Sequence, residues 1–174
     1  MNSEKLVQEL TQLGFKIETS GEMIRVKVEP ERVREVMHNL KRLGVNLFLS
    51  LTAIDEPSAS VIKLLYHLTS TINPKLVVVV ETSVARDKPI VPSIADIYPA
   101  AQIQEREEHE MLGVVFEGNP DLRRLLLPPD WPKDVYPLRK DFKIAEEPFT
   151  STRQSKPIQL HAAENCEHHR TNSA

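Results

Sequence analysis

Residues 61–82 read VIKLLYHLTSTINPKLVVVVET, two apolar runs separated by a short polar stretch. Apolar runs of this length that are rich in valine, isoleucine and leucine are typical of β-strands. Thr71–Pro74 ends in an Asn-Pro pair, which marks a turn. The pattern therefore predicts that Val61–Thr69 and Leu76–Thr82 pair as an antiparallel hairpin.

The residues before this hairpin predict two helices and two further strands. Ser3 can cap a helix from about Glu4 to Leu13, and Pro30 suits the first position of a second helix that ends before Gly44. The alternating run Ile24–Val28 and the apolar run Leu47–Ile54 are typical of strands. The order αβαβββ predicts an α+β fold, a small and mainly antiparallel sheet with helices packed on one face.

Length and composition fit one domain, or one domain with a tail, and exclude several kinds of site. The chain has 174 residues, 40% of them hydrophobic, and a formal net charge of -3, which does not point to nucleic acid. Cys166 is the only cysteine, so an internal disulfide and a four-cysteine cluster are excluded. The longest apolar run, Leu76–Val80, is too short to span a bilayer. No secretory signal is expected at the start, and a cytoplasmic protein is predicted.

The composition changes after about residue 88. Ten of the 13 prolines lie from Pro89 onward. Three regions are predicted: an α+β domain over residues 1–115 that includes a charged helix at 99–112, an extended segment at 116–147, and a polar, mobile tail at 148–174. Apolar side chains on a proline-rich backbone indicate that the middle region is ordered by wrapping over a surface, its own or a partner's.

The charged helix carries four glutamates, one arginine and one histidine in residues 105–110. Its apolar stripe is predicted to be Ile103, Met111 and Val114, with Glu107 lying on that stripe. A charge placed there must reach water or be paired, because burying it alone is costly.

Two interpretations of this helix follow. In one, it is a solvated face that the pairs Glu105–His109 and Arg106–Glu110 support along the helix. In the other, it is a docking helix, and the side chains that pair with another subunit are Arg106, Glu107 and Glu110.

Catalytic chemistry finds little support in the sequence. The Glu-x-x-His spacing of di-iron helices is not met, because Arg106 stands three residues before His109. There is no Gly-x-Ser-x-Gly elbow, and the five glycines form no phosphate loop. A weaker hypothesis, a metal site near the C-terminus, rests on His161, Cys166, His168 and His169, which lack a second well-spaced pair.

Residues 105–142 resemble the signature of the 30-kilodalton subunit family of respiratory complex I. The same module occurs in energy-converting membrane-bound [NiFe] hydrogenases and their relatives. The motifs that carry the resemblance are Glu105-Arg106-Glu107, Leu112-Gly113-Val114, Phe116–Arg124 and Pro137–Phe142.

Departures from the respiratory pattern refine this resemblance. The respiratory form usually has an aromatic residue and Asp in place of His109 and Glu110, and His in place of Asn119. Two other runs, Glu110–Gly113 and Leu127–Pro132, look closer to the branch found in archaeal membrane-bound [NiFe] hydrogenase and sulfane (sulfur) reductase complexes.

The resemblance implies a peripheral subunit with no catalytic, cofactor-binding or metal-binding residues of its own. Its partners would be a large [NiFe]-hydrogenase-like (49-kilodalton-type) subunit, iron–sulfur subunits that hold the clusters, and, indirectly, a membrane arm. It would lie on the cytoplasmic face of the cell membrane, held by these partners. The alternatives are a subunit of an NADH- or reduced-deazaflavin:quinone dehydrogenase and a stand-alone protein-binding module. The implied interface and charge-pair positions are Glu105, Arg106, Glu107, Glu110, Asp121, Arg123, Arg124, Trp131, Tyr136, Leu138, Arg139 and Asp141.

Overall fold

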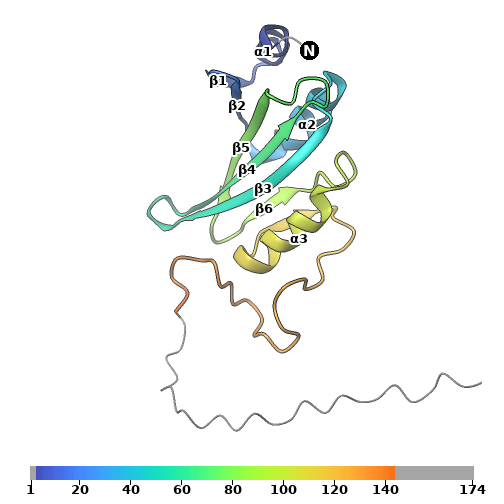
Figure 1. Ribbon diagram of the computed structural model, residues 1–174. Helices are drawn as coiled ribbons and strands as arrows, with labels where there is room; N and C mark the ends of the chain where they lie inside the picture. Colours follow the sequence, from blue (N-terminus) through green and yellow to red (C-terminus); the bar gives the residue numbers. More distant parts are fainter. Residues whose placement is uncertain (1–2, 144–174) are drawn as a thin grey trace, which may run out of the picture. The chain divides into compact units, whose positions relative to one another are not determined.

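A five-stranded sheet in the order β1-β2-β5-β4-β3 is the framework of residues 3–143, the part of the chain that the computed structural model describes (Figure 1). Only the β2–β5 pair is parallel, and the other three pairs are antiparallel. The predicted α+β class with a mainly antiparallel sheet is therefore confirmed. The strands are β1 (Lys16–Ser20), β2 (Met23–Lys27), β3 (Leu47–Glu56), β4 (Val61–Thr69) and β5 (Val77–Ala85).

The β4–β5 hairpin is the centre of this sheet, as the opening pattern predicts. Its register pairs Val61 with Ala85 and Thr69 with Val77 without a break. Alternate residues of β4 are fully buried, among them Leu64 and Leu68. The hairpin is closed at its turn by the Thr69 hydroxyl, which donates to the Leu76 carbonyl at 2.7 Å.

Three strands are absent from the sequence prediction. β1 is an edge strand whose residues are almost all exposed, so it carries no apolar alternation. β6 (Ile90–Pro92) and β7 (Val115–Glu117) are three residues each and form a separate parallel pair. Because each buries only its middle residue, Val91 and Phe116, neither produces a recognisable pattern.

The helices α1 (Ser3–Gln12) and α2 (Val33–Arg42) each bury one apolar face in the core. The second helix begins later than predicted, since Pro30–Arg32 forms a separate 3-10 turn, η1, before it. A similar turn, η2 (Pro57–Ala59), joins β3 to β4. No helix within residues 3–143 combines the length and the apolar character needed to cross a membrane.

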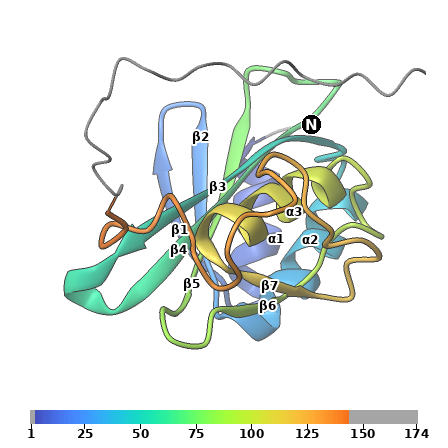
Figure 2. The ribbon, with the colours of Figure 1, turned by 90° about the horizontal axis from the view of Figure 1, so that it is seen from below.

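Helix α3 (Ala101–Leu112) ends at Gly113, whose φ of 80° is a left-handed cap. After β7 the described chain continues to Lys143 without helices or strands and runs beside α3, as Figure 2 shows from below. The predicted tail at 148–174, with its His161–His169 cluster, lies outside the described residues.

Candidate functional site

The buried face of helix α3 has a carboxylate at its centre, where an apolar side chain would be expected. Glu105 is 0% exposed. It accepts hydrogen bonds from the Ser93 hydroxyl at 2.6 Å, the Ile94 amide at 2.8 Å and the Asn119 side-chain amide at 2.8 Å. Burial raises the pKa of Glu105, and the three donors oppose that rise. Glu105 thus ties α3 to the approach to the helix and to the segment after β7.

Two polar side chains of α3, those of Gln104 and Glu108, cover the edge of β3 that does not pair with β4. The Gln104 side-chain oxygen accepts from the Leu51 amide at 2.5 Å, and a Glu108 carboxylate oxygen accepts from the Ala53 amide at 3.1 Å. These two side chains occupy donors that an unpaired edge strand would offer to another chain. Burial raises the pKa of Glu108 to about 7, the Ala53 hydrogen bond lowers it, and the nearby charge of Glu107 adds to the rise.

Tyr66 on β4 sits in the same electrostatic environment. It is fully buried, and its hydroxyl has no hydrogen-bond partner among the described residues. Burial raises its pKa well above the ordinary value, and the charges of Glu105 and Glu108 contribute. The core beneath α3 therefore disfavours further negative charge.

On the side of α3 that faces the segment after β7, Glu110 clamps the backbone of three consecutive leucines. Its carboxylate accepts from the amides of Leu125 at 3.1 Å, Leu126 at 2.7 Å and Leu127 at 2.9 Å. Burial raises the pKa of Glu110, but the three amides and the Arg124 charge outweigh this and leave the pKa lowered. A charged acceptor with several donors is a strong anchor.

Arg106 lies one turn earlier on α3 and binds carbonyl groups of the same backbone segment. Its guanidinium donates to the carbonyl oxygens of Arg123 and Arg124 and lies 3.7 Å from the Asp121 carboxylate. Asp121 also accepts two hydrogen bonds from the Arg123 side chain at 2.9 Å each, and these hold its pKa well below the ordinary value.

The held backbone presents apolar side chains outward. Leu126 is 59% exposed and Leu125 is 37% exposed, and Pro128 and Pro129 after them are exposed too. We call residues 123–131 the leucine loop. It is closed on itself by the Arg124 guanidinium, which donates to the Pro128 carbonyl at 2.7 Å and the Trp131 carbonyl at 2.5 Å.

Residues after the leucine loop return to the end of α3. The Leu138 amide donates to the Met111 carbonyl at 3.2 Å, and the Arg139 guanidinium donates to the Leu112 carbonyl at 2.9 Å. The contact between Leu138 and Met111 is a backbone hydrogen bond, so it holds the segment whatever the side chains are. The Leu138 side chain itself is exposed.

The same segment packs an aromatic ring over the cap of α3. The Tyr136 ring covers Gly113, where an added Cβ would stand 2.5 Å from the ring carbon Cζ. The Arg139 guanidinium lies 4.6 Å from the centre of that ring. Glycine is therefore required at position 113 both by its backbone conformation and by the ring.

A second charged centre fixes the end of the described chain to the sheet. Arg86 bridges Asp55, at 2.7 Å, and Asp141, also at 2.7 Å. The Asp55 side chain is fully buried and also accepts from the Lys140 amide at 2.8 Å. The hydrogen bond from Arg86 is the main reason why the pKa of Asp55 is lowered.

The structure corrects the predicted orientation of α3. Ile103, expected on the buried stripe, is 55% exposed, whereas Glu105 and Leu112 are buried. The pairs expected along the helix are replaced by the contacts described above, and His109 lies with its Nδ1 atom 2.8 Å from the Val114 carbonyl oxygen. Glu107 is exposed, so its charge reaches water. This is one of the two arrangements predicted for it, the other being a paired charge.

The predicted interface residues fall into two groups. Glu105 lies inside the chain, where a partner subunit cannot reach its carboxylate. The others lie on α3 or in the segment after β7, which includes the leucine loop, and most of them contact their own chain. Their role in an interface stays a prediction. The sequence reasoning missed Gln104, Glu108, Asp55 and Arg86, because their partners are backbone groups or residues far away in sequence.

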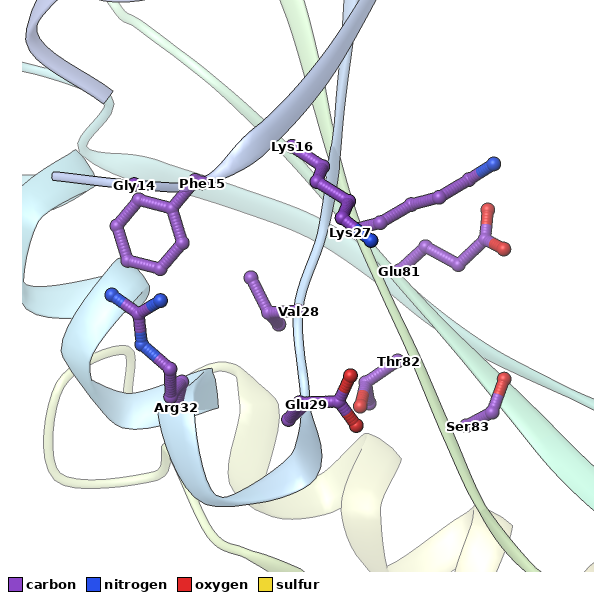
Figure 3. A pocket seen from close by; sticks show the side chains of 10 residues that line it. All are labelled: Gly14, Phe15, Lys16, Lys27, Val28, Glu29, Arg32, Glu81, Thr82 and Ser83. Atoms are coloured by element: carbon purple, nitrogen blue, oxygen red, sulfur yellow. The ribbon is translucent and has the colours of Figure 1, made fainter. Parts of the chain in front are cut away.

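A separate cavity of about 350 Å³ lies between the start of β1, the end of β2, η1 and β5 (Figure 3). Its lining includes the cations Lys16, Lys27 and Arg32 and the carboxylates Glu29 and Glu81. The charges are mixed, so the cavity selects no ligand by its sign. Among residues 3–143, no three His, Cys, Asp or Glu side chains are placed to hold a metal ion.

Comparison with known proteins decides the family. Residues 26–148 match the sequence model described as "Respiratory-chain NADH dehydrogenase, 30 Kd subunit". The chain belongs to this family. An NADH-quinone oxidoreductase subunit of Moorella thermoacetica is 35% identical over 148 residues, which cover 83% of this chain and 97% of that protein. The family that the motifs resemble is thereby confirmed.

Two solved structures share the fold. One is described as Nqo5 of the trypsin-resistant fragment (1-134), with a TM-score of 0.61, 28% identity, and coverage of 70% of this chain and all of that one. The other belongs to the membrane-bound sulfane sulfur reductase, an archaeal respiratory membrane complex, with a TM-score of 0.74, 29% identity, and coverage of 82% of this chain and 86% of that one. Relatives of this chain are thus subunits of multi-subunit respiratory complexes.

Proposed function

We propose that this chain is a non-catalytic subunit of the peripheral arm of a membrane-bound, ion-translocating oxidoreductase related to respiratory complex I. It docks on the large [NiFe]-hydrogenase-like subunit and supports assembly of the electron-transfer module. The observation that carries this proposal is the arrangement around α3. Arg106 and Glu110 bind the chain's own backbone, and the segment they hold exposes its leucines. Charged side chains that hold an exposed apolar loop in place suit a docking subunit better than a catalytic one.

The chain binds no cofactor in this proposal, and the iron–sulfur clusters belong to neighbouring subunits. The buried carboxylates of Glu105 and Glu110 support this role, because both oxygens of each already accept from amide or hydroxyl donors of the same chain. The subunit lies on the cytoplasmic face of the membrane and is held there by its partners. Elemental analysis of the purified full-length chain tests the cofactor part, and stoichiometric iron or zinc would refute it.

Two kinds of parent complex are supported by different observations. A hydrogenase or sulfane reductase type is favoured by the TM-score of 0.74 with the archaeal complex. An NADH- or reduced-deazaflavin:quinone dehydrogenase type is favoured by 35% identity with the NADH-quinone oxidoreductase relative. The large subunit decides between them, since a hydrogenase type that keeps its nickel site has four cysteine ligands.

The test is purification of the affinity-tagged full-length chain from its own cells after mild detergent extraction. Mass spectrometry is expected to identify a large subunit and iron–sulfur subunits in fixed ratio to the tagged chain. Activity assays of that complex with hydrogen, sulfane sulfur and quinone then identify its type. Recovery of the tagged chain alone, as a stable monomer, would refute the proposal and favour a stand-alone binding module.

A further inference from the structure

The leucine loop has exposed apolar side chains on a backbone that is unusually well fixed. Three amides in a row are held by Glu110, and two preceding carbonyl groups are held by Arg106. Within the loop, the Trp131 amide donates to the Pro128 carbonyl at 3.0 Å. A loop without regular secondary structure normally loses conformational entropy when it binds. This loop has already lost most of that freedom in the folded chain.

The side chains next to the loop's apolar tip set the kind of surface that suits it. Arg123 and Lys133 are exposed, and so are Asp130 and Asp134. An apolar centre inside a rim of mixed charge is the usual composition of a protein–protein contact. An anionic lipid surface would instead call for an excess of basic side chains around the leucines.

A second copy of the chain is a poorer partner for geometric reasons. An apolar hollow does exist elsewhere on the chain, lined by Leu6, Leu43 and Ile72. A loop of one copy inserted there would make a head-to-tail contact between two different surfaces. Contacts of that kind close only into rings and otherwise propagate into open filaments.

We infer that Leu125 and Leu126 insert into an apolar groove on the large subunit of the parent complex, with Arg106 and Glu110 as positioning residues for this contact. This inference rests on the proposed function and names the surface that performs it. Rigid, exposed apolar side chains are good anchors because little ordering opposes their burial in a partner. The charges of α3 then act on the partner indirectly, through the backbone that they hold.

The first test replaces both leucines in the tagged full-length chain, as Leu125→Asp together with Leu126→Asp. The matched control is Ile72→Asp, at a residue that is 79% exposed in the turn between β4 and β5. The double variant is expected to recover the large subunit at least about tenfold less well, and the control to recover it normally. Both variants are expected to keep the thermal unfolding midpoint of the unsubstituted chain, since the changed side chains are exposed.

The second test keeps the loop intact and maps its contact directly. A photo-reactive benzoylphenylalanine is placed at position 126 or, as the control, at position 72, and the native complex is irradiated. Position 126 is expected to cross-link to the large subunit, and position 72 is not. Cross-links from position 126 to a second copy of this chain or to lipid overturn the inference.

The two proposals fail in different ways. If the unsubstituted chain recovers no oxidoreductase subunits, the proposed function fails and the loop contact fails with it. If the unsubstituted chain and the double-leucine variant recover the large subunit equally well, the proposed function stands and the loop contact is refuted. A double variant that unfolds is detected by its unfolding midpoint, and the cross-link from position 126 then decides alone.

Discussion

Glu108→Gln is expected to stabilise the folded chain at pH 8 and to change its stability little near pH 5. The pKa of Glu108 is about 7 in the folded chain, against an ordinary value of 4.5. Between these values the folded chain keeps a proton that the unfolded chain has released. The free energy of unfolding therefore falls as pH rises from about 4.5 to about 7, and it stays low above that range. Glutamine carries no charge, so the variant escapes this loss.

The size of the gain in stability follows from the same difference in the pKa of Glu108. A tenfold change in proton affinity corresponds to about 1.4 kcal/mol, so a rise from 4.5 to about 7 sets an upper bound of about 3 kcal/mol. Glu108 keeps partial contact with water, which screens its charge, so a gain of about 1–2 kcal/mol at pH 8 is expected. The glutamine oxygen can still accept from the Ala53 amide, so the contact with the edge of β3 is retained.

Urea unfolding of the isolated chain at several pH values between 5 and 8 measures this gain. The control is Glu107→Gln, which removes an exposed charge one residue earlier and is expected to change stability by at most about 0.5 kcal/mol at each pH. The slope of the unfolding curve should be the same in all three chains. A difference between the unsubstituted chain and Glu108→Gln that is constant across the pH range, or that grows toward pH 5, would refute the reasoning.

Three further changes probe other contacts. Gly113→Ala should destabilise the chain by at least about 2 kcal/mol in urea unfolding, because the added Cβ meets an aromatic ring. The control Gly118→Ala, at a glycine that also has positive φ but faces open space, should cost about 1 kcal/mol. Equal costs for the two variants would contradict this reasoning. Arg86→Ala should cost about 2–3 kcal/mol at pH 7 by leaving the buried Asp55 carboxylate without its cation. Arg86 lowers the pKa of Asp55, so this cost should shrink as falling pH protonates the carboxylate, and a cost that stays constant as the pH falls would refute the pairing. Glu110→Gln should speed amide hydrogen exchange in the leucine loop about tenfold without changing exchange in β4, and unchanged loop exchange would rule out the clamp.

The central hairpin could be predicted because its signal is local. The valines of β5 and the alternating apolar residues of β4 are contiguous, and a turn separates them. Strand β1 gives no such signal, because four of its five residues are exposed at the edge of the sheet. The parallel β6–β7 pair could not be found from an apolar pattern, because each strand has three residues and buries only the middle one.

Helix α3 shows why the candidate site was harder to predict than the fold. An apolar stripe assumes that charged residues face water, and Glu105 breaks that assumption because its partners are supplied by residues 93, 94 and 119. Backbone amides such as those that Glu110 binds leave no trace in the amino-acid sequence. The resemblance to the 30-kilodalton subunit family located the right segment, although it did not show that the charges are used within the chain.

The contact of α3 with the edge of β3 also has a consequence during translation of the chain. Leu51 and the side chain that accepts from it, that of Gln104, are 53 residues apart in sequence. At about 5–20 residues per second, translation exposes this strand edge for roughly 3–10 s before its cover is synthesised. During that interval the uncovered edge of β3 is open to pairing with a neighbouring chain. A messenger cut short before the codons of α3 would leave a product with a permanently open sheet.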